Sequence, residues 1–238
     1  MNELQELKFK ELAETAQVRV AFYSFLNLHF VTLVDRAFVV RLRNGELSTV
    51  LEALKQDEFN EDDVIAGATL MLDYLKKTSE MDLDQLTEKL GVDRTCLYRG
   101  VAKGYGPPPP YELIWSKNAE DYSVLQTISR VYRDAGLEPS PDAKERLDYI
   151  SVEMDFLREL AQSEVLAWNS GDSLSASSLL EKQRDFMNLH FGAWVPLYIE
   201  KAFEQVETDF YRGHLLMLRG FVLMQKEIFS AISLVAEA

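Results

Sequence analysis

Residues 136–160, GLEPSPDAKERLDYISVEMDFLREL, join a loop interrupted by two prolines to a segment with helical periodicity. Pro139 and Pro141 lack a backbone N–H donor and restrict the residue before them, so no helix can run through them. From residue 142 to residue 168, apolar side chains recur every three or four positions and form two neighbouring stripes. The sequence therefore predicts a long helix that is buried on two sides.

Glu153 falls between the two apolar stripes of this helix. A buried carboxylate needs a hydrogen-bonding partner or stays protonated. We expect a Tyr, His or Arg of the C-terminal helices to be that partner. The plainer interpretation of the whole region is a hinge loop followed by a core helix whose first turn favours acidic residues.

The rest of the chain is helical in pattern as well. Among its 238 residues are 11 glycines and 7 prolines, and no segment shows the alternation of a β-strand. Helices are expected at about 3–29, 33–43, 46–55, 60–77, 82–90, 94–100, 120–135, 173–191, 194–211 and 214–236. The predicted fold is all-α: a single compact helical bundle with a proline-rich loop at 101–118. A hinge loop at 136–147 would divide it into an N-terminal helical unit, 1–135, and a C-terminal helical unit, 148–238.

The net charge of the chain limits which classes of molecule it is expected to bind. Lys and Arg total 25 against 39 Asp and Glu, a formal net charge of -14, which repels nucleic acid and anionic membranes and favours a basic partner. The single cysteine, Cys96, cannot form an internal disulfide. No signal-peptide pattern and no run of about 18 apolar residues occurs, so we expect a soluble cytoplasmic protein.

Residues for catalysis are scarce. His29, His190 and His214 fall on three different predicted helices, and none follows a Glu at the Glu-x-x-His spacing of di-iron bundles. No cysteine pair, phosphate-binding glycine loop or G-x-S-x-G motif occurs. We expect no enzyme activity, metal or cofactor, and interpret each histidine as a packed or capping residue.

Residues 82–100, DLDQLTEKLGVDRTCLYRG, have the helix, glycine turn, helix spacing of a DNA-reading helix-turn-helix. Its second helix would offer Arg94, Thr95, Tyr98 and Arg99 to a groove. The flanking helices add little positive charge and the whole chain is acidic. A short helical pair packed on a bundle is the simpler interpretation.

Residues 107–115, PPPPYELIW, form a stiff loop that enters a helical turn. Tyr111 and Trp115 would share one side of that turn, beside Glu112. The rings either pin the loop on the core or form the floor of a groove for an apolar peptide with carboxylates at its rim.

Several segments, in a fixed order, resemble the TorD/DmsD/NarJ family of redox-enzyme maturation chaperones. They are LYRG at 97–100, PPPPYELIW, GLEP at 136–139, RLDYISVEMDFL at 146–157 and LHFGAWVPLYIEKAFEQVETDFYRGHLLMLRGF at 189–221. The resemblance covers about residues 13–229. It implies a cytoplasmic all-helical chaperone of molybdenum-containing oxidoreductases, and the match of LYRG argues against the DNA-reading alternative.

The family's Pro-Asp-His hinge motif falls on Leu147, Asp148 and Tyr149. Asp148 matches, whereas Leu replaces the Pro and Tyr replaces the His, so a proton-dependent role of the histidine is not carried over. The alternative alignment on Pro141-Asp142-Ala143 leaves the wrong distance to residues 153–156. In the family, the hinge motif and the proline-aromatic loop are implicated in binding the partner's leader peptide.

A twin-arginine leader presents two guanidinium groups before an apolar stretch, so its receptor needs carboxylates beside an aromatic groove. For each acid alone, a solvated surface position is the plainer interpretation. The candidate peptide-binding residues are the acids Glu112, Glu138, Asp142, Glu145 and Asp148, with Leu97, Tyr98, Pro110, Tyr111, Trp115 and Tyr149 as the apolar and aromatic part.

The leading functional hypothesis is a chaperone that binds the twin-arginine leader, the apo-form, or both, of a molybdopterin oxidoreductase catalytic subunit and assists its maturation before export. One alternative is a chaperone of a nitrate-reductase-like subunit that lacks an export leader and is bound through its body. A more distant alternative is a helix-turn-helix DNA-binding regulator. The resemblance implies a monomer or a hinge-linked, domain-swapped dimer.

Overall fold

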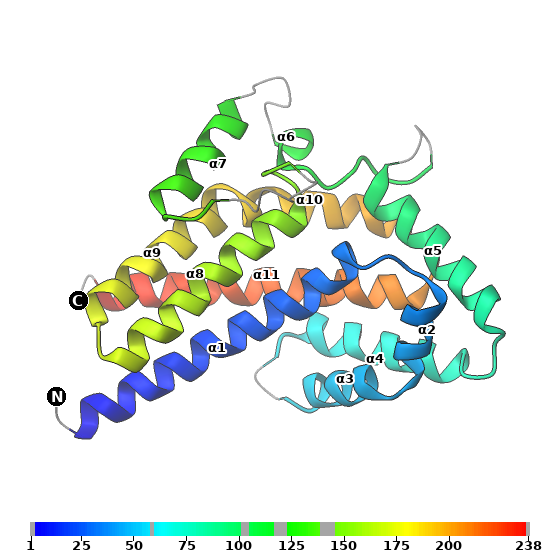
Figure 1. The fold of residues 1–238 in the computed structure, drawn as a ribbon, viewed down its shortest axis with the longest axis horizontal. Coiled ribbons are helices and arrows are strands. Elements are labelled where there is room, and N and C mark those ends of the chain that lie inside the picture. The colour runs from blue at the N-terminus through cyan, green and yellow to red at the C-terminus, as the bar shows by residue number, and fades with distance from the viewer. Residues whose placement is uncertain (1–2, 58–59, 101–104, 117–122, 139–145, 237–238) are drawn as a thin grey trace. The chain divides into compact units, whose positions relative to one another are not determined.

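The computed structural model describes residues 3–57, 60–100, 105–116, 123–138 and 146–236. These residues form eleven α-helices and no β-strand, which confirms the predicted all-α class (Figure 1). Within the described ranges, no helix combines the length and the apolar character that crossing a bilayer requires.

The chain forms two compact units, and each unit is assembled from separated stretches. The first unit contains Met1–Leu28, Tyr111–Trp194 and Phe229–Ala238, and the second contains His29–Pro110 and Val195–Ile228. Three helices contribute residues to both units: α1 (Glu3–Val31), α10 (Phe191–Phe203) and α11 (Asp209–Ala236). Residues 136–147, expected to separate two helical units, fall inside the middle stretch of the first unit.

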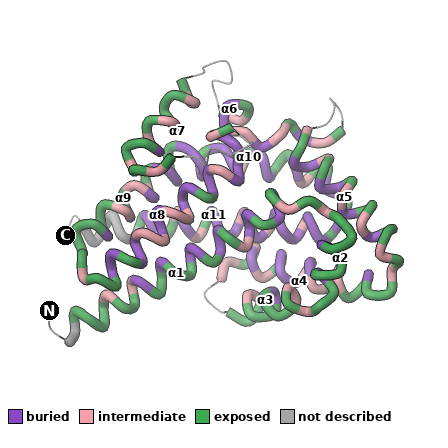
Figure 2. The backbone as a smooth tube through the Cα atoms, in the orientation of Figure 1, coloured by how far each residue is buried: buried purple, intermediate pink, exposed green. Residues whose placement is uncertain are grey.

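Small apolar side chains build the centre of the first unit. Besides most of α1, this unit holds α6 (Glu112–Trp115), α7 (Ser123–Asp134), α8 (Ile150–Ser170) and α9 (Ser173–Leu189). Ala16 and Val20 of α1 pack against Ala161 and Val165 of α8 in one buried cluster. Figure 2 shows buried positions recurring along the whole of α8, as the two predicted apolar stripes require.

A buried ion pair crosses this apolar centre. Arg19 of α1 donates to the carboxylate of Glu164 on α8, and both side chains are buried. The same carboxylate accepts from Gln183 Nε2 of α9 at 2.7 Å and from Trp168 Nε1 at 3.0 Å. Because the buried charges are paired and bonded, the network fixes three helices in one register.

The second unit holds α2 (Arg36–Arg43), α3 (Glu46–Gln56), α4 (Asp62–Lys77) and α5 (Leu83–Arg99), with the parts of α10 and α11 that belong to it. A Cβ on Gly67 of α4 would lie 2.4 Å from the carbonyl oxygen of Gly213 on α11, so glycine lets these helices touch. At the start of α11, the buried Asp93 carboxylate accepts from the backbone N–H of Thr208 at 2.8 Å.

The expectation of two short helices at 82–90 and 94–100 is wrong, because α5 continues through Gly91. Leu86, Leu90 and Leu97 lie buried on one stripe that crosses the glycine without a break. Arg94 is buried as well and donates to the carbonyl oxygen of Phe30. The helix-turn-helix alternative therefore lacks both its turn and an exposed reading helix.

The central helix also begins later than expected, at Ile150 rather than near residue 142. Tyr149 precedes it in an extended conformation, with φ −81° and ψ 138°. Its backbone forms an isolated antiparallel bridge with Tyr111. A turn closed by the Tyr149 N–H and the carbonyl oxygen of Arg146, at 3.0 Å, precedes it, so the helix cannot begin earlier within residues 146–149; residues 139–145 lie outside the described part.

Two smaller expectations also need correction. α4 begins at Asp62 rather than at about residue 60, and the Asn60 amide donates to the carbonyl oxygen of Leu54 at 2.8 Å. α10 begins at Phe191 and ends at Phe203, rather than running from about 194 to 211, and Pro196 lies inside it.

Candidate functional site

The proline-aromatic loop and the hinge motif join in the first unit. The bridge between Tyr111 and Tyr149 is accompanied by a backbone bond of 2.8 Å from the Glu112 N–H to the Asp148 carbonyl oxygen. The two tyrosine rings lie against each other with centroids 4.9 Å apart. The two segments that the resemblance singled out therefore form one local structure.

Asp148 lies at the centre of this structure and is fully buried. Its Oδ2 accepts from the backbone N–H of Leu113 at 3.2 Å, which ties the carboxylate to the first turn of α6. The guanidinium of Arg146 binds the carboxylate with both arms, Nε to Oδ1 at 2.9 Å and Nη2 to Oδ2 at 2.6 Å. Arg146 Cζ also lies 4.6 Å from the centre of the Tyr111 ring. One guanidinium is thus held by a carboxylate fork and an aromatic face.

Two further buried carboxylates lie beside Asp148. His190 Nδ1 lies 3.0 and 3.1 Å from the two carboxylate oxygens of Glu112. Glu153 accepts from Trp194 Nε1 at 3.0 Å through Oε2, and its side chain also lies within hydrogen-bonding reach of Glu112, which requires a proton on one of the two carboxyl groups. Burial, then the charges of Glu112 and Asp148, raise the pKa of Glu153 well above 4.5, although the Trp194 bond opposes this. Glu153 therefore favours its protonated form.

An apolar groove of about 250 Å³ runs between α7 and α9. Its lining is mainly apolar, its floor includes the buried Phe156 and Phe186, and Leu189 on one side is 71% exposed. Asp134 and Asp185 are exposed carboxylates of the same groove. The lining residues are Val131, Asp134, Ala135, Phe156, Lys182, Asp185, Phe186, Leu189 and His190.

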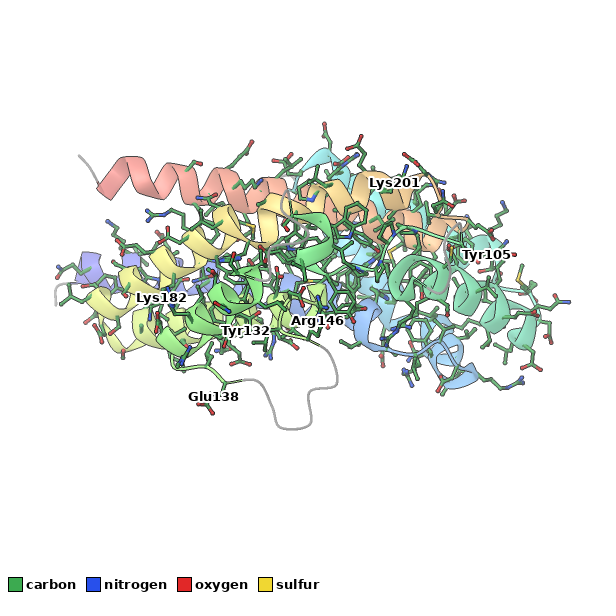
Figure 3. The ribbon with its side chains drawn as sticks, turned by 90° about the horizontal axis from the view of Figure 1, so that it is seen from above. Tyr105, Tyr132, Glu138, Arg146, Lys182 and Lys201 are labelled. Atoms are coloured by element: carbon green, nitrogen blue, oxygen red, sulfur yellow. The ribbon has the colours of Figure 1, made fainter. Side chains whose placement is uncertain are left out.

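Tyr132 connects the groove to the hinge motif. Its ring stacks on Phe156 with centroids 4.2 Å apart, and its hydroxyl donates to the carbonyl oxygen of Leu147 at 3.1 Å. Burial, together with the charges of Glu153 and Glu112, raises the pKa of this phenol well above its usual range, so it remains a donor. Figure 3 shows Lys182, Tyr132 and Arg146 following one another across the first unit.

Residues 53–200 match the family described as the nitrate reductase delta subunit. The chain belongs to this family. Two curated relatives are chaperones by name. The chain is 22% identical to the chaperone protein TorD of Vibrio cholerae over 224 residues, which is 94% of each chain. It is 25% identical to the perchlorate reductase assembly chaperone protein of Dechloromonas aromatica over 112 residues, 47% of this chain and 49% of the relative.

The match to the perchlorate reductase relative thus spans about half of that relative's length. No solved structure matches this member of the delta subunit family at a significant level.

In this member of the delta subunit family, the described carboxylates that the sequence assigned to the rim of a groove do not form such a rim. Asp148 and Glu112 are buried and bound to Arg146 and His190, so neither offers a vacant carboxylate to solvent. Glu138 is exposed and points away from the helices (Figure 3). Asp142 and Glu145 lie outside the described residues.

The aromatic and apolar candidates also differ in how exposed they are. Tyr111 and Trp115 are partly exposed, whereas Tyr149 is buried. Leu97 and Tyr98, expected to be part of the groove floor, are fully buried in the second unit. There the Tyr98 hydroxyl lies 2.7 Å from His214 Nδ1.

Pro110 is buried in the second unit as well. The loop that leads to it is held close to α5, since a Cβ on Gly100, at φ 56°, would lie 2.5 Å from Pro109 Cδ. Glycine at position 100 is therefore required by the approach of the proline loop.

Sequence reasoning missed Arg146, Tyr132 and Trp194. Arg146 had a usable signal, because it is a basic residue two positions before Asp148 and so lies close to that carboxylate along the chain. Tyr132 and Trp194 carry no such local signal, since their partners are far away along the chain. His190 was expected to be a packed or capping residue; it caps α9 and stacks on Phe186 at 4.9 Å, and it also bonds Glu112.

Proposed function

We propose that this protein is an assembly chaperone that binds the twin-arginine leader of a molybdenum-containing oxidoreductase subunit before export. Family membership and two relatives named as chaperones support the chaperone role. The net charge of -14 suits a basic client segment.

The observation that carries the leader-binding part is the site formed by Asp148 and Tyr111. This carboxylate and ring already bind a guanidinium, that of Arg146, with two hydrogen bonds and an aromatic contact. Such a site distinguishes arginine from lysine, because an ammonium cannot supply two parallel N–H donors. An arginine of the leader is the ligand that this chemistry fits best.

The groove between α7 and α9 is proposed to take the apolar stretch that follows the arginines. Its aromatic floor and the exposed Leu189 provide apolar contact area, and Asp134 is an exposed carboxylate beside it. Tyr132 links this groove to the hinge motif within the same unit. A peptide with a basic and an apolar half matches the two parts.

Calorimetric titration of the purified protein with a synthetic twin-arginine leader tests the proposal. The matched control is the same peptide with both arginines replaced by lysine. We expect saturable binding of the arginine peptide and binding at least about tenfold weaker for the lysine peptide. Absence of binding to either peptide by correctly folded protein would rule out leader recognition.

A second candidate function is a chaperone of a nitrate-reductase-like subunit that carries no export leader. The family description, nitrate reductase delta subunit, favours it. Such a client would be bound through its folded or partly folded body. Co-purification with a client catalytic subunit whose N-terminal segment has been deleted separates the two: retention of the truncated client supports this second function.

A further inference from the structure

Arg146 and Asp148 form a pair with very unequal exposure. The Asp148 side chain is 0% exposed, whereas the Arg146 side chain is 49% exposed. The carboxylate and the arginine therefore do not form a sealed internal pair, because solvent reaches one partner and not the other. The guanidinium lies at the mouth of a binding site whose acceptor is inside.

The acceptor side of the site is held by contacts that do not involve Arg146. The Leu113 N–H fixes the Asp148 carboxylate, and the Glu112 N–H fixes its backbone carbonyl. The Tyr111 ring is positioned by its bridge to Tyr149 and by the contact between the two rings. Carboxylate and ring are thus preorganised by the protein framework, and Arg146 is the exchangeable component.

We infer that Arg146 is an internal occupant of the leader's arginine site, and that a client arginine binds by displacing it. This inference rests on the proposed leader-binding function. The entering and leaving groups have the same chemistry, so a client guanidinium can make again the two hydrogen bonds to Asp148 and the contact with the Tyr111 ring that Arg146 gives up. The Asp148 carboxylate, whose burial without a partner would be costly, is then paired in both states.

Two consequences follow for recognition. The apparent affinity for the leader is reduced by the fraction of molecules in which Arg146 has left the site. Peptides without a guanidinium are rejected more strongly than by an open carboxylate, because they would have to displace a bidentate arginine and replace it with a weaker donor. Arg146 therefore lowers affinity and raises selectivity for arginine.

The decisive experiment measures leader affinity in full-length variants by calorimetry. Arg146→Gln removes the charge and the fork while keeping much of the side-chain length. Arg158→Gln is the matched control, since Arg158 of α8 pairs with Asp155 and Glu159 on the surface. We expect Arg146→Gln to bind the twin-arginine leader about tenfold more tightly than the wild type, and Arg158→Gln to change affinity less than about twofold.

We also expect Arg146→Gln to bind the two-lysine peptide more tightly than the wild type does. Wild-type binding together with equal or weaker binding by folded Arg146→Gln would overturn the inference and leave leader recognition intact. If neither protein bound the leader, the proposed function itself would fall, and the inference with it.

A measurement on the wild-type protein guards against a variant that fails to fold. In protein labelled with ¹⁵N-arginine, the Nε–H signal of Arg146 is assigned by its absence from Arg146→Lys. On saturation with leader, this signal should shift and exchange faster with water, as its bond to Asp148 is lost. An unchanged Arg146 signal in the presence of bound leader would contradict displacement.

Discussion

At the scale of single residues, Asp148 connects three partners: the Leu113 N–H, the Glu112 N–H through its carbonyl, and the Arg146 guanidinium. Asp148→Asn keeps the size of the side chain but loses the charge that holds a guanidinium fork. Introduced into Arg146→Gln, where no internal guanidinium is weakened at the same time, it should weaken leader binding by roughly 1–3 kcal/mol, the cost of leaving a buried hydrogen-bonding group without its partner. Calorimetry measures this, and Asp155→Asn, at an exposed position of α8, should leave affinity unchanged. Equal effects of the two substitutions would place the arginine site elsewhere.

Glu153 provides a prediction on pH. Its pKa in the folded protein is raised above the ordinary value of 4.5, so the folded state holds the proton more tightly than the unfolded chain does. Stability from this residue is therefore present at low pH and is lost as pH rises toward the folded-state pKa.

The uncharged variant Glu153→Gln should lose less stability than the wild type between about pH 5 and about pH 8. Thermal unfolding at the two pH values measures this difference. Glu159→Gln, also on α8 but partly exposed, is the control and should follow the wild-type pH dependence. A wild-type-like pH dependence of Glu153→Gln would show that Glu153 does not carry the effect.

The sequence already indicated that Glu153 is buried, because it lies between two apolar stripes, and the structure confirms that. The partner was expected to be Tyr, His or Arg and is instead Trp194, 41 positions along the chain. Local periodicity reports which side of a helix is buried. It does not report which side chain of another helix faces that position.

At the scale of elements, apolar periodicity predicted most helices, including the long helix with two buried sides. The prediction of helix ends failed in α5, where a single glycine was interpreted as the end of one helix and the start of another. Gly91 was interpreted as a turn, yet the buried stripe of α5 passes through it. In contrast, α8 begins directly after the long-range bridge between Tyr111 and Tyr149, which periodicity cannot reveal.

The groove between α7 and α9 gives a prediction at this scale. Leu189→Ser should weaken leader binding by roughly 1–2 kcal/mol, because an apolar contact surface would be lost from the complex. Leu174 lies on the same helix, is 84% exposed and does not line the groove, so Leu174→Ser is the matched control. Fluorescence anisotropy with a labelled leader measures both. If the two variants bind alike, the apolar stretch of the leader is held by another surface.

At the scale of the whole molecule, the net charge of -14 should steer a basic leader toward the protein. We expect the association rate constant to fall severalfold between about 50 mM and about 500 mM NaCl, as screening shortens the range of attraction. The dissociation rate should change less, since the bound arginine is partly shielded from solvent. Stopped-flow fluorescence measures both rates, and an association rate independent of salt would argue against steering.

The division of the chain into two units restricts when the protein becomes competent during its synthesis. The unit that holds Asp148 also includes residues from position 229 onward, and Arg19 lies 5.9 Å from the ring of Phe229 within it. A nascent chain paused at the ribosome before that point lacks the last contribution to this unit. We therefore expect a chain that stops before residue 229 not to hold Asp148 and Tyr111 in the arrangement that would bind an arginine.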